Sequence, residues 1–367
     1  MCDCKGGEKS VMSFKVIPKS AFAPWVARLL DGYKVIGPAA AAHGRYSFKE
    51  ITAPDQLALD YTQSVLPPKK RLLPRRESLF RFDMSKGSIE PTIDAEPTVL
   101  LGVHTCDLHA IQLLDEVFQA GYADQHYMAR RAATTIVSIE CLSPCTPHSF
   151  CKSMGTASVT EGFDLHLTDM GDSYAIDVGT DKGAALLDSF GPELVEASTA
   201  DITRLNQTLS DKWPRFPYRI ETDITDLANL LSVSYQSDLW DELGERCLAC
   251  GACTIVCPTC YCFNVVDEVD FTLEAGVRYR QWDGCPLHEF ALVAGGHNFR
   301  PANADRQRHR FYRKGKYQMD AHGLAGCVGC GRCADACLVG INPVETFNEL
   351  ARRRIPMTRR HQEMYVK

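Results

Sequence analysis

Two runs of cysteines with the same spacing constrain this chain more than any other feature. The first run reads Cys247-x2-Cys250-x2-Cys253-x3-Cys257, and the second reads Cys327-x2-Cys330-x2-Cys333-x3-Cys337. Three cysteines two residues apart wrap one corner of a cubane 4Fe-4S cluster, whereas the fourth ligates the other cluster in two-cluster ferredoxins. We therefore expect two 4Fe-4S clusters with crossed ligation. The first set is Cys247, Cys250, Cys253 and Cys337, and the second is Cys327, Cys330, Cys333 and Cys257.

Other uses of cysteine are less consistent with this pattern. A single Cys-x-x-Cys pair would be ambiguous, because zinc sites and redox dithiols also use it. Two complete four-cysteine runs favour clusters, and zinc or disulfides are the alternatives. The turn after the second run is expected to differ, since Leu338 follows Cys337 where Pro258 follows Cys257.

The composition is typical of a soluble globular protein. The chain has 367 residues, of which 45% are apolar and 23% charged, so we expect two or three packed units. Seventeen cysteines predict a reducing compartment. No apolar stretch approaches the roughly 18 residues that span a bilayer, and residues 1–7 lack the apolar core of an export signal. These features predict a cytoplasmic protein with no membrane span.

The charge distribution does not favour nucleic acid as a partner. The formal net charge is -6, although basic residues gather at 69–76, 300–316 and 352–360. We interpret these tracts as solvated surface. A docking face for acidic partners is the alternative.

The first half of the chain has the pattern of a parallel βαβ unit. A β-rich apolar run from Thr98 to His104 precedes Thr105-Cys106-Asp107 and apolar residues at helical spacing. A second apolar run, 135–139, is followed directly by Glu140-Cys141. Both predicted strands carry a cysteine at their carboxyl ends, which is the edge where open α/β sheets bind ligands.

Four cysteines of this half are therefore candidates for a third cluster. Alternatively, some are buried small apolar residues, as free cysteine often is, or the four hold zinc. The candidate ligands are Cys106, Cys141, Cys145 and Cys151.

The fold class that we predict is a mixed α/β domain followed by a mainly helical, bacterial-ferredoxin-like dicluster domain. The expected boundaries are 1–186 for the α/β domain, 187–244 for a helical bridge and 245–367 for the dicluster domain, with an inserted lobe at 258–326. The lobe carries Cys260, Cys262 and Cys285, whose roles the sequence does not define. His288 and His297 are interpreted as structural residues, with proton or metal binding as the alternative.

Several segments together resemble the iron-sulfur beta subunit of soluble hydrogenase/sulfur reductases and of anaerobic sulfite reductases. The similarity covers most of the chain. The segments are Pro67-Pro68-Lys69-Lys70, Gly102-Val103-His104-Thr105-Cys106-Asp107-Leu108, Phe150-Cys151-Lys152-Ser153-Met154-Gly155, Cys257-Pro258-Thr259-Cys260-Tyr261-Cys262-Phe263 and Arg280-Gln281-Trp282-Asp283-Gly284-Cys285, together with 295–301 and the last cysteine run.

The resemblance implies an electron-transfer subunit without bond chemistry of its own. Its partners would be a flavoprotein linked to NAD(P)H or ferredoxin, and a catalytic subunit of the hydrogenase, sulfite/sulfur reductase or heterodisulfide-reductase-like kind. The chain departs from similar proteins at His104-Thr105, where they have Arg-Pro, and at Ser149, where they have cysteine. Cys145 is the candidate replacement for the ligand lost at Ser149.

A second functional hypothesis is a reductase with its own substrate or flavin pocket near Cys106 and Cys141. The sequence contains no Gly-x-Gly-x-x-Gly turn and no P-loop, the usual phosphate-binding signatures. No nucleophile-base pair stands out either. We therefore prefer the electron-transfer hypothesis.

Overall fold

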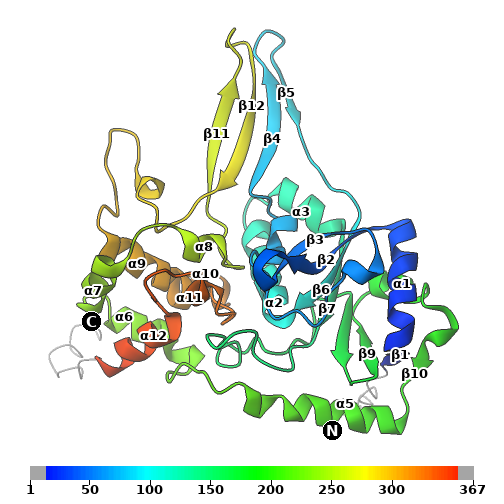
Figure 1. Ribbon diagram of the computed structural model, residues 1–367. Coiled ribbons are helices and arrows are strands. Elements are labelled where there is room, and N and C mark those ends of the chain that lie inside the picture. The colour runs from blue at the N-terminus through cyan, green and yellow to red at the C-terminus, as the bar shows by residue number, and fades with distance from the viewer. Residues whose placement is uncertain (1–13, 354–367) are drawn as a thin grey trace, which may run out of the picture.

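A mixed eight-stranded sheet organises the first half of the chain. The computed structural model describes residues 14–353 (Figure 1). Four neighbouring central strands are parallel, and antiparallel strands flank them on both sides. The order across the sheet is β10 (Val195–Glu196), β1 (Lys15–Pro18), β9 (Ser173–Val178), β8 (Leu165–Asp169), β7 (Thr134–Ile139), β6 (Thr98–His104), β2 (Lys34–Ala41) and β3 (Arg45–Ile51).

The predicted βαβ unit is confirmed. Strands β6 and β7 pair in parallel, with His104 opposite Ile139, and helices α2 (Thr105–Gln119) and α3 (Gln125–Ala132) connect them. All of β6 is buried, which explains its unbroken apolar sequence. Cys106 lies in the first turn of α2 and Cys141 lies just beyond β7, so both follow the carboxyl ends of neighbouring strands.

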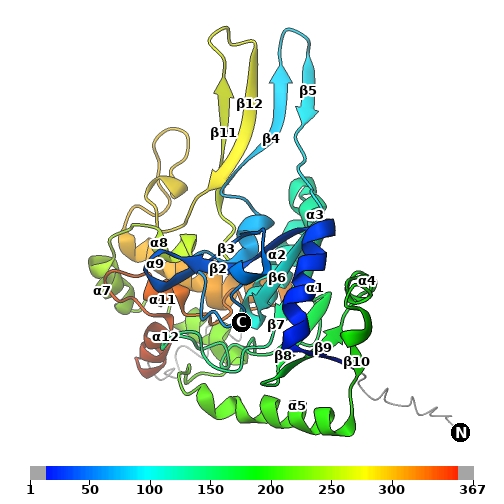
Figure 2. The same ribbon diagram turned by 45° about the vertical axis from the view of Figure 1, so that its right-hand side comes forward.

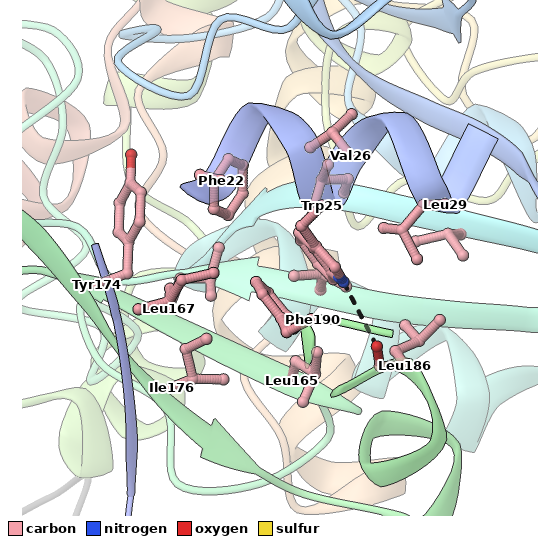
Figure 3. Close-up of a cluster of buried hydrophobic side chains, with 14 of the residues drawn as sticks. Phe22, Trp25, Val26, Leu29, Leu165, Leu167, Tyr174, Ile176, Leu186 and Phe190 are labelled. Carbon is pink, nitrogen blue, oxygen red and sulfur yellow. Dashed lines mark hydrogen bonds between the residues drawn. The ribbon is translucent and has the colours of Figure 1, made fainter. Parts of the chain in front are cut away.

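Helices cover both faces of this sheet. Helices α1 (Lys19–Gly32) and α4 (Asp181–Leu187) bury their apolar residues on one face, and α2 and α3 bury theirs on the other. Figure 3 shows the first of these cores, where the ring of Trp25 stacks on Phe190 with centroids 4.1 Å apart. The indole N–H of Trp25 donates to Ser189 Oγ at 2.9 Å and to the Leu186 carbonyl at 3.4 Å, so the polar atom of this buried ring has partners.

The carboxy-terminal part is mainly helical, as predicted. Its core joins Leu231, Trp240, Phe311 and Phe347 from four helices. These helices are α6 (Leu227–Val233), α7 (Leu239–Arg246), α9 (Asn303–Tyr312) and α12 (Pro343–Arg352). The remaining helices here are α8 (Ala252–Ile255), α10 (Gln318–His322) and α11 (Arg332–Asp335), with a π-helical turn at Arg313–Tyr317.

Two hairpins from distant parts of the sequence form a second sheet, which we call the arm. Its strands lie in the order β11 (Phe263–Val269), β12 (Ala275–Trp282), β4 (Arg76–Asp83) and β5 (Ser88–Pro91). The first pair belongs to the inserted lobe and the second to the α/β domain. Figures 1 and 2 show the arm projecting from the rest of the molecule.

Buried ion pairs connect these parts. Glu77 at the base of the arm accepts from Arg130 of α3 at 2.5 Å and also pairs with Arg280 of β12. Arg332 of α11 forms a bidentate pair with Asp107 of α2, with N–O distances of 2.6 and 2.7 Å. Buried ion pairs, in addition to the covalent chain, therefore hold the α/β domain, the arm and the dicluster region together.

The segment predicted as a helical bridge contributes to both sides. Within 187–244, β10 pairs with β1 of the large sheet, α5 (Thr199–Asp211) follows it, and α6 and α7 pack into the dicluster core. The three boundaries themselves stay a prediction. Among residues 14–353, no helix is long and apolar enough to cross a membrane, and residues 1–7, judged above for an export signal, lie outside the described range.

Candidate iron-sulfur centres

The two cysteine runs adopt the same local structure. In each, a left-handed glycine precedes a short helix that carries the third cysteine: Gly251 (φ 74°) before α8, and Gly331 (φ 80°) before α11. The residue before the second cysteine is also left-handed, Ala249 (φ 52°) in one run and Gly329 (φ 67°) in the other. These positive φ angles curl the chain, so that successive cysteines surround a common space.

The first predicted ligand set surrounds one cavity. Cys247, Cys250, Cys253 and Cys337 all line it. Two sulfur atoms of this set accept hydrogen bonds from the protein. The backbone N–H of Ala249 donates to Cys247 Sγ at 3.3 Å, Gln307 Nε2 donates to the same sulfur at 2.9 Å, and the N–H of Ile341 donates to Cys337 Sγ at 3.2 Å.

The second predicted set surrounds the neighbouring cavity. Cys257, Cys327, Cys330 and Cys333 line it, together with Cys253 of the first set. The N–H of Gly329 donates to Cys327 Sγ at 3.4 Å, and the Thr259 hydroxyl lies 3.2 Å from Cys257 Sγ. Burial raises the pKa of Cys327, Cys330 and Cys333 to about 12, so these thiols hold their protons at neutral pH until a metal displaces them.

These residues fit a cluster. Within residues 14–353, no three His, Cys, Asp or Glu side chains lie close enough together to hold a single metal ion. The thiols instead line cavities, and thiolates with hydrogen bonds to sulfur are the donor set of a 4Fe-4S cluster. All fifteen cysteines of the described range are free thiols, so none is used in a disulfide there. Ligation of particular irons by particular cysteines stays a prediction.

Basic residues that we expected at the solvated surface instead lie beside these thiols. Arg310 is 5% exposed and lines the cavities of both ligand sets, while Lys314 lines the second. Lys69 is 2% exposed and donates to the Cys257 carbonyl at 2.7 Å. The surface interpretation of the tracts 69–76 and 300–316 is therefore wrong for these three. The tract 352–360 lies almost entirely outside the described residues.

A signal for Arg310 was present in the sequence. Arg306, Arg310 and Lys314 are spaced by four residues, which places them along one side of a helix. All three lie between the two cysteine runs. Net charge and composition could not show which side of that helix faces the thiols.

The four candidate cysteines of the α/β domain lie beside the second set. Cys106 and Cys151 share a buried cluster with Cys330. Cys141 accepts from Thr105 Oγ1 at 3.4 Å, and a hydrogen bond from the Cys145 thiol, with a contribution from His104, lowers its pKa to about 5. Cys145 Sγ in turn lies 3.6 Å from His104 Nδ1. The structure thus brings these four thiols into one region at the carboxyl ends of β6 and β7.

The residues that depart from the family pattern have structural roles here. Ser149 is buried and its hydroxyl donates to the Cys330 carbonyl at 3.3 Å, so it helps to join the 148–151 segment to the second run. The ring of His104 stacks on Tyr61 with centroids 4.0 Å apart. Neither of the lobe histidines, His288 and His297, is buried, and His288 contacts Glu289 and Asn298.

Two comparisons place these features among known proteins. Residues 246–341 match the family described as the 4Fe-4S dicluster domain. Over 339 residues, the chain is 34% identical to the protein named sulfhydrogenase 2 subunit beta from Pyrococcus furiosus. The aligned part covers 92% of this chain and 98% of that protein.

Proposed function

Since this chain belongs to the family of iron-sulfur beta subunits of the sulfhydrogenase type, we propose that it relays electrons between a flavin-containing partner and a catalytic partner. The flavoprotein would be linked to NAD(P)H or ferredoxin. The catalytic partner would be a hydrogenase, a sulfite or sulfur reductase, or a heterodisulfide-reductase-like subunit. We propose a cytoplasmic location for the complex.

One observation carries this proposal. The two four-thiol cavities adjoin, and Cys253 and Arg310 line both. A bound 4Fe-4S cluster supplies a reversible one-electron couple, whose potential depends on charge, burial and hydrogen bonds to sulfur. Two such centres side by side form a path through the protein rather than a single reaction site.

The exposure of the two thiol sets supports a path with an end at the surface. Cys250 of the first set is exposed, and Leu248 and Leu338, which line the same cavity, are 60% and 82% exposed. Cys330 of the second set is buried. We therefore propose that the first set exchanges electrons with a partner docked around Leu248 and Leu338, and that the second set leads inward.

The residues around the thiols have definable roles in such a relay. Backbone N–H groups and Gln307 stabilise negative charge on sulfur, and Arg310 adds a fixed positive charge between the sets. Both effects favour the reduced form of a bound centre. Packing by Phe150, Phe311 and Phe347 in the lining of the second cavity excludes water.

We also propose that Cys106, Cys141, Cys145 and Cys151 hold a third cluster that extends the relay. Their position beside Cys330 supports this. The alternative of a reductase with a pocket at Cys106 and Cys141 is less well supported, because these thiols are only 4% and 8% exposed and offer a substrate little access. Loss of a distinct set of iron signals in Cys106→Ser would support the third cluster. Unchanged iron content would contradict it.

A single substitution tests the relay. In the native complex, Cys337→Ser should abolish electron transfer between the catalytic partner and NAD(P) or ferredoxin, while the catalytic partner still reacts with an artificial viologen dye. The measurement is the ratio of these two rates in anaerobically purified complexes. If the chain alone reduced sulfur compounds or protons with a viologen donor, the relay proposal would fail.

Crossed ligation makes a separate prediction. Cys337→Ser should damage the cluster bound by Cys247, Cys250 and Cys253, whereas Cys257→Ser should damage the other. Electron paramagnetic resonance of each variant, with iron and acid-labile sulfide analysis, distinguishes the two centres. Loss of the cluster that belongs to the same run as the replaced cysteine would refute the crossed scheme.

A further inference from the structure

Three thiols outside both cysteine runs and outside the Cys106 group meet in a cavity of their own. Cys260, Cys262 and Cys285 line it. Strand β11 begins directly after Cys262 and pairs with β12, so Phe263 lies opposite Trp282, and the Asp283 N–H donates to the Cys262 carbonyl at 3.0 Å. The base of this hairpin therefore brings Cys285 back to Cys260 and Cys262. With the eight cysteines of the two runs and the four of the Cys106 group, these three account for all fifteen cysteines of the described range.

The wall of this cavity is strongly basic. Arg310, Arg313 and Lys314 line it. The Lys314 ammonium donates to Thr259 Oγ1 at 2.6 Å, and Arg310 donates to Gln307 Oε1 at 3.2 Å. Lys69 lies close by, with its ammonium on the Cys260 carbonyl and 4.5 Å from the centre of the Trp282 ring. Within residues 14–353, no Asp or Glu side chain lies within ion-pair distance of Arg310, Lys314 or Lys69.

Four other buried cations of the described residues have carboxylate partners, while a fifth, Arg306, donates to the backbone carbonyls of Arg300 and Pro301. Arg130 and Arg280 pair with Glu77, Lys212 pairs with Glu140, and Arg332 pairs with Asp107. A buried charge without a partner costs several kcal/mol, so folded proteins pair such charges or bind a counterion. Clusters on the two predicted ligand sets would supply part of this charge, because Arg310 lines both of those cavities and Lys314 lines the second. The cavity of Cys260, Cys262 and Cys285 is a third place where these two cations meet thiols, and Arg313 adds a further positive charge there.

We propose that Cys260, Cys262 and Cys285 hold an additional iron-sulfur cluster through three thiolates, and that its negative charge helps to balance Arg310, Arg313 and Lys314. A thiolate-lined, basic cavity suits a soft, anionic centre. A lone zinc ion fits less well. Zn–S bonds of about 2.3 Å need thiolates within about 4 Å of one another, and no three such side chains within residues 14–353 lie close enough together to hold a single ion. These three are the only cysteines among the described residues that line the cavity, so one iron of a cubane would carry a ligand other than thiolate.

The cluster would stand beside the relay proposed above and does not depend on it. Arg310 lines the cavities of both ligand sets and this one, so it would be shared by three centres. A centre with one iron free of thiolate can bind an external ligand, unlike a fully thiolate-bound one. This distinguishes it from the two predicted dicluster centres.

The test uses the full chain, purified without oxygen, with Cys262→Ser and Cys285→Ser as variants. Cys260 is avoided because its thiol neighbours that of Cys257. Each variant should lose about three or four irons with matching acid-labile sulfide. In the same samples, the paramagnetic signals of the two dicluster centres should persist, which also shows that the variants fold. Mössbauer spectra of the wild type separate a three-iron from a four-iron centre.

A second measurement applies even where a variant fails to fold. In the untreated wild-type chain, the thiols of Cys262 and Cys285 should resist alkylation, and they should react after iron is removed with a chelator under denaturing conditions. Cys106→Ser is the matched control, because it should leave this centre's signal in place. Unchanged iron content in both variants, alkylation of the native thiols, or stoichiometric zinc would each overturn the proposal, while leaving the relay proposal standing.

Discussion

At the scale of one residue, Arg310 is a buried cation that lies beside the candidate cluster ligands. It is 5% exposed, no carboxylate of the described residues pairs with it, and it lines three thiol-lined cavities. The surrounding thiol groups raise the pKa of Arg310 despite the opposing effect of burial, which keeps the guanidinium charged. A fixed positive charge in this place favours every step that adds an electron to a neighbouring centre.

Removing this charge should lower the reduction potentials of the neighbouring centres. Arg310→Met keeps an unbranched, flexible side chain, although a shorter one, and deletes the cation, so we expect a shift of the order of 50–100 mV toward negative values at an effective dielectric constant of about 20. A redox titration followed by electron paramagnetic resonance measures it. Arg308→Met is the control, because Arg308 lies on the same helix but pairs with Asp305 at 2.7 Å. Equal shifts in both variants would contradict the assigned role.

At the scale of elements, the arm depends on one buried carboxylate. Glu77 of β4 lies between Arg130 of α3 and Arg280 of β12, and the guanidinium of Arg280 also pairs with Asp124. Both partners of Glu77 are desolvated, since the side chains of Arg130 and Arg280 are each 3% exposed. Breaking a buried pair by removing one partner leaves an uncompensated charge, which is far more costly than losing a pair at the surface.

Glu77→Gln should therefore destabilise the chain by roughly 3–5 kcal/mol. Glu268→Gln on the same arm is the matched control. Glu268 pairs with Arg76 at the surface, with side chains 60% and 55% exposed, so its loss should cost about 0–1 kcal/mol. Urea unfolding followed by circular dichroism compares the two variants. Similar midpoints would show that the Glu77 cluster does not hold the arm in place.

At the scale of the whole molecule, the α/β domain and the dicluster region meet where backbone lies against backbone. The N–H of Phe150 donates to the Gly329 carbonyl at 2.7 Å. A Cβ atom on Gly329 would lie 2.6 Å from the Cys151 nitrogen, and one on Gly331 would lie 2.8 Å from the His148 carbonyl carbon. Both glycines also have positive φ angles. The second cysteine run can therefore approach the 148–151 segment only with glycine at these two positions.

Gly329→Ala should separate these two regions and reduce iron binding by the second set. Gly323→Ala is the matched control, because Gly323 has nearly the same φ angle (68° against 67°) but nothing within 4 Å of a built Cβ. Gly323→Ala should lower the free energy of unfolding only by the cost of a left-handed alanine, which is about 1–2 kcal/mol. Iron content and paramagnetic signals of the two variants give the comparison. Equal losses would mean that the backbone conformation matters and the close approach does not.

What the sequence determined is the chemistry and the local structure. Spacing along one run depends only on the geometry of a short segment, so two, two and three intervening residues predict the curled loop that Gly251 and Gly331 permit. The two apolar runs of 98–104 and 135–139, with residues at helical spacing between them, likewise predicted a parallel βαβ unit, because burial of both faces of β6 requires continuous apolar residues.

Only the tertiary structure decided where charges and distant segments meet. The pairing of β4 with β12 joins residues from two predicted domains, and no local pattern specifies such a partner. Lys69 and Arg310 are of residue types that usually lie at the surface, yet both are buried. Lys69 donates to the Cys257 carbonyl and Arg310 lines the thiol cavities, and neither contact follows from the local sequence. Local spacing is a property of a few covalent bonds, whereas burial and pairing depend on the packing of the entire chain.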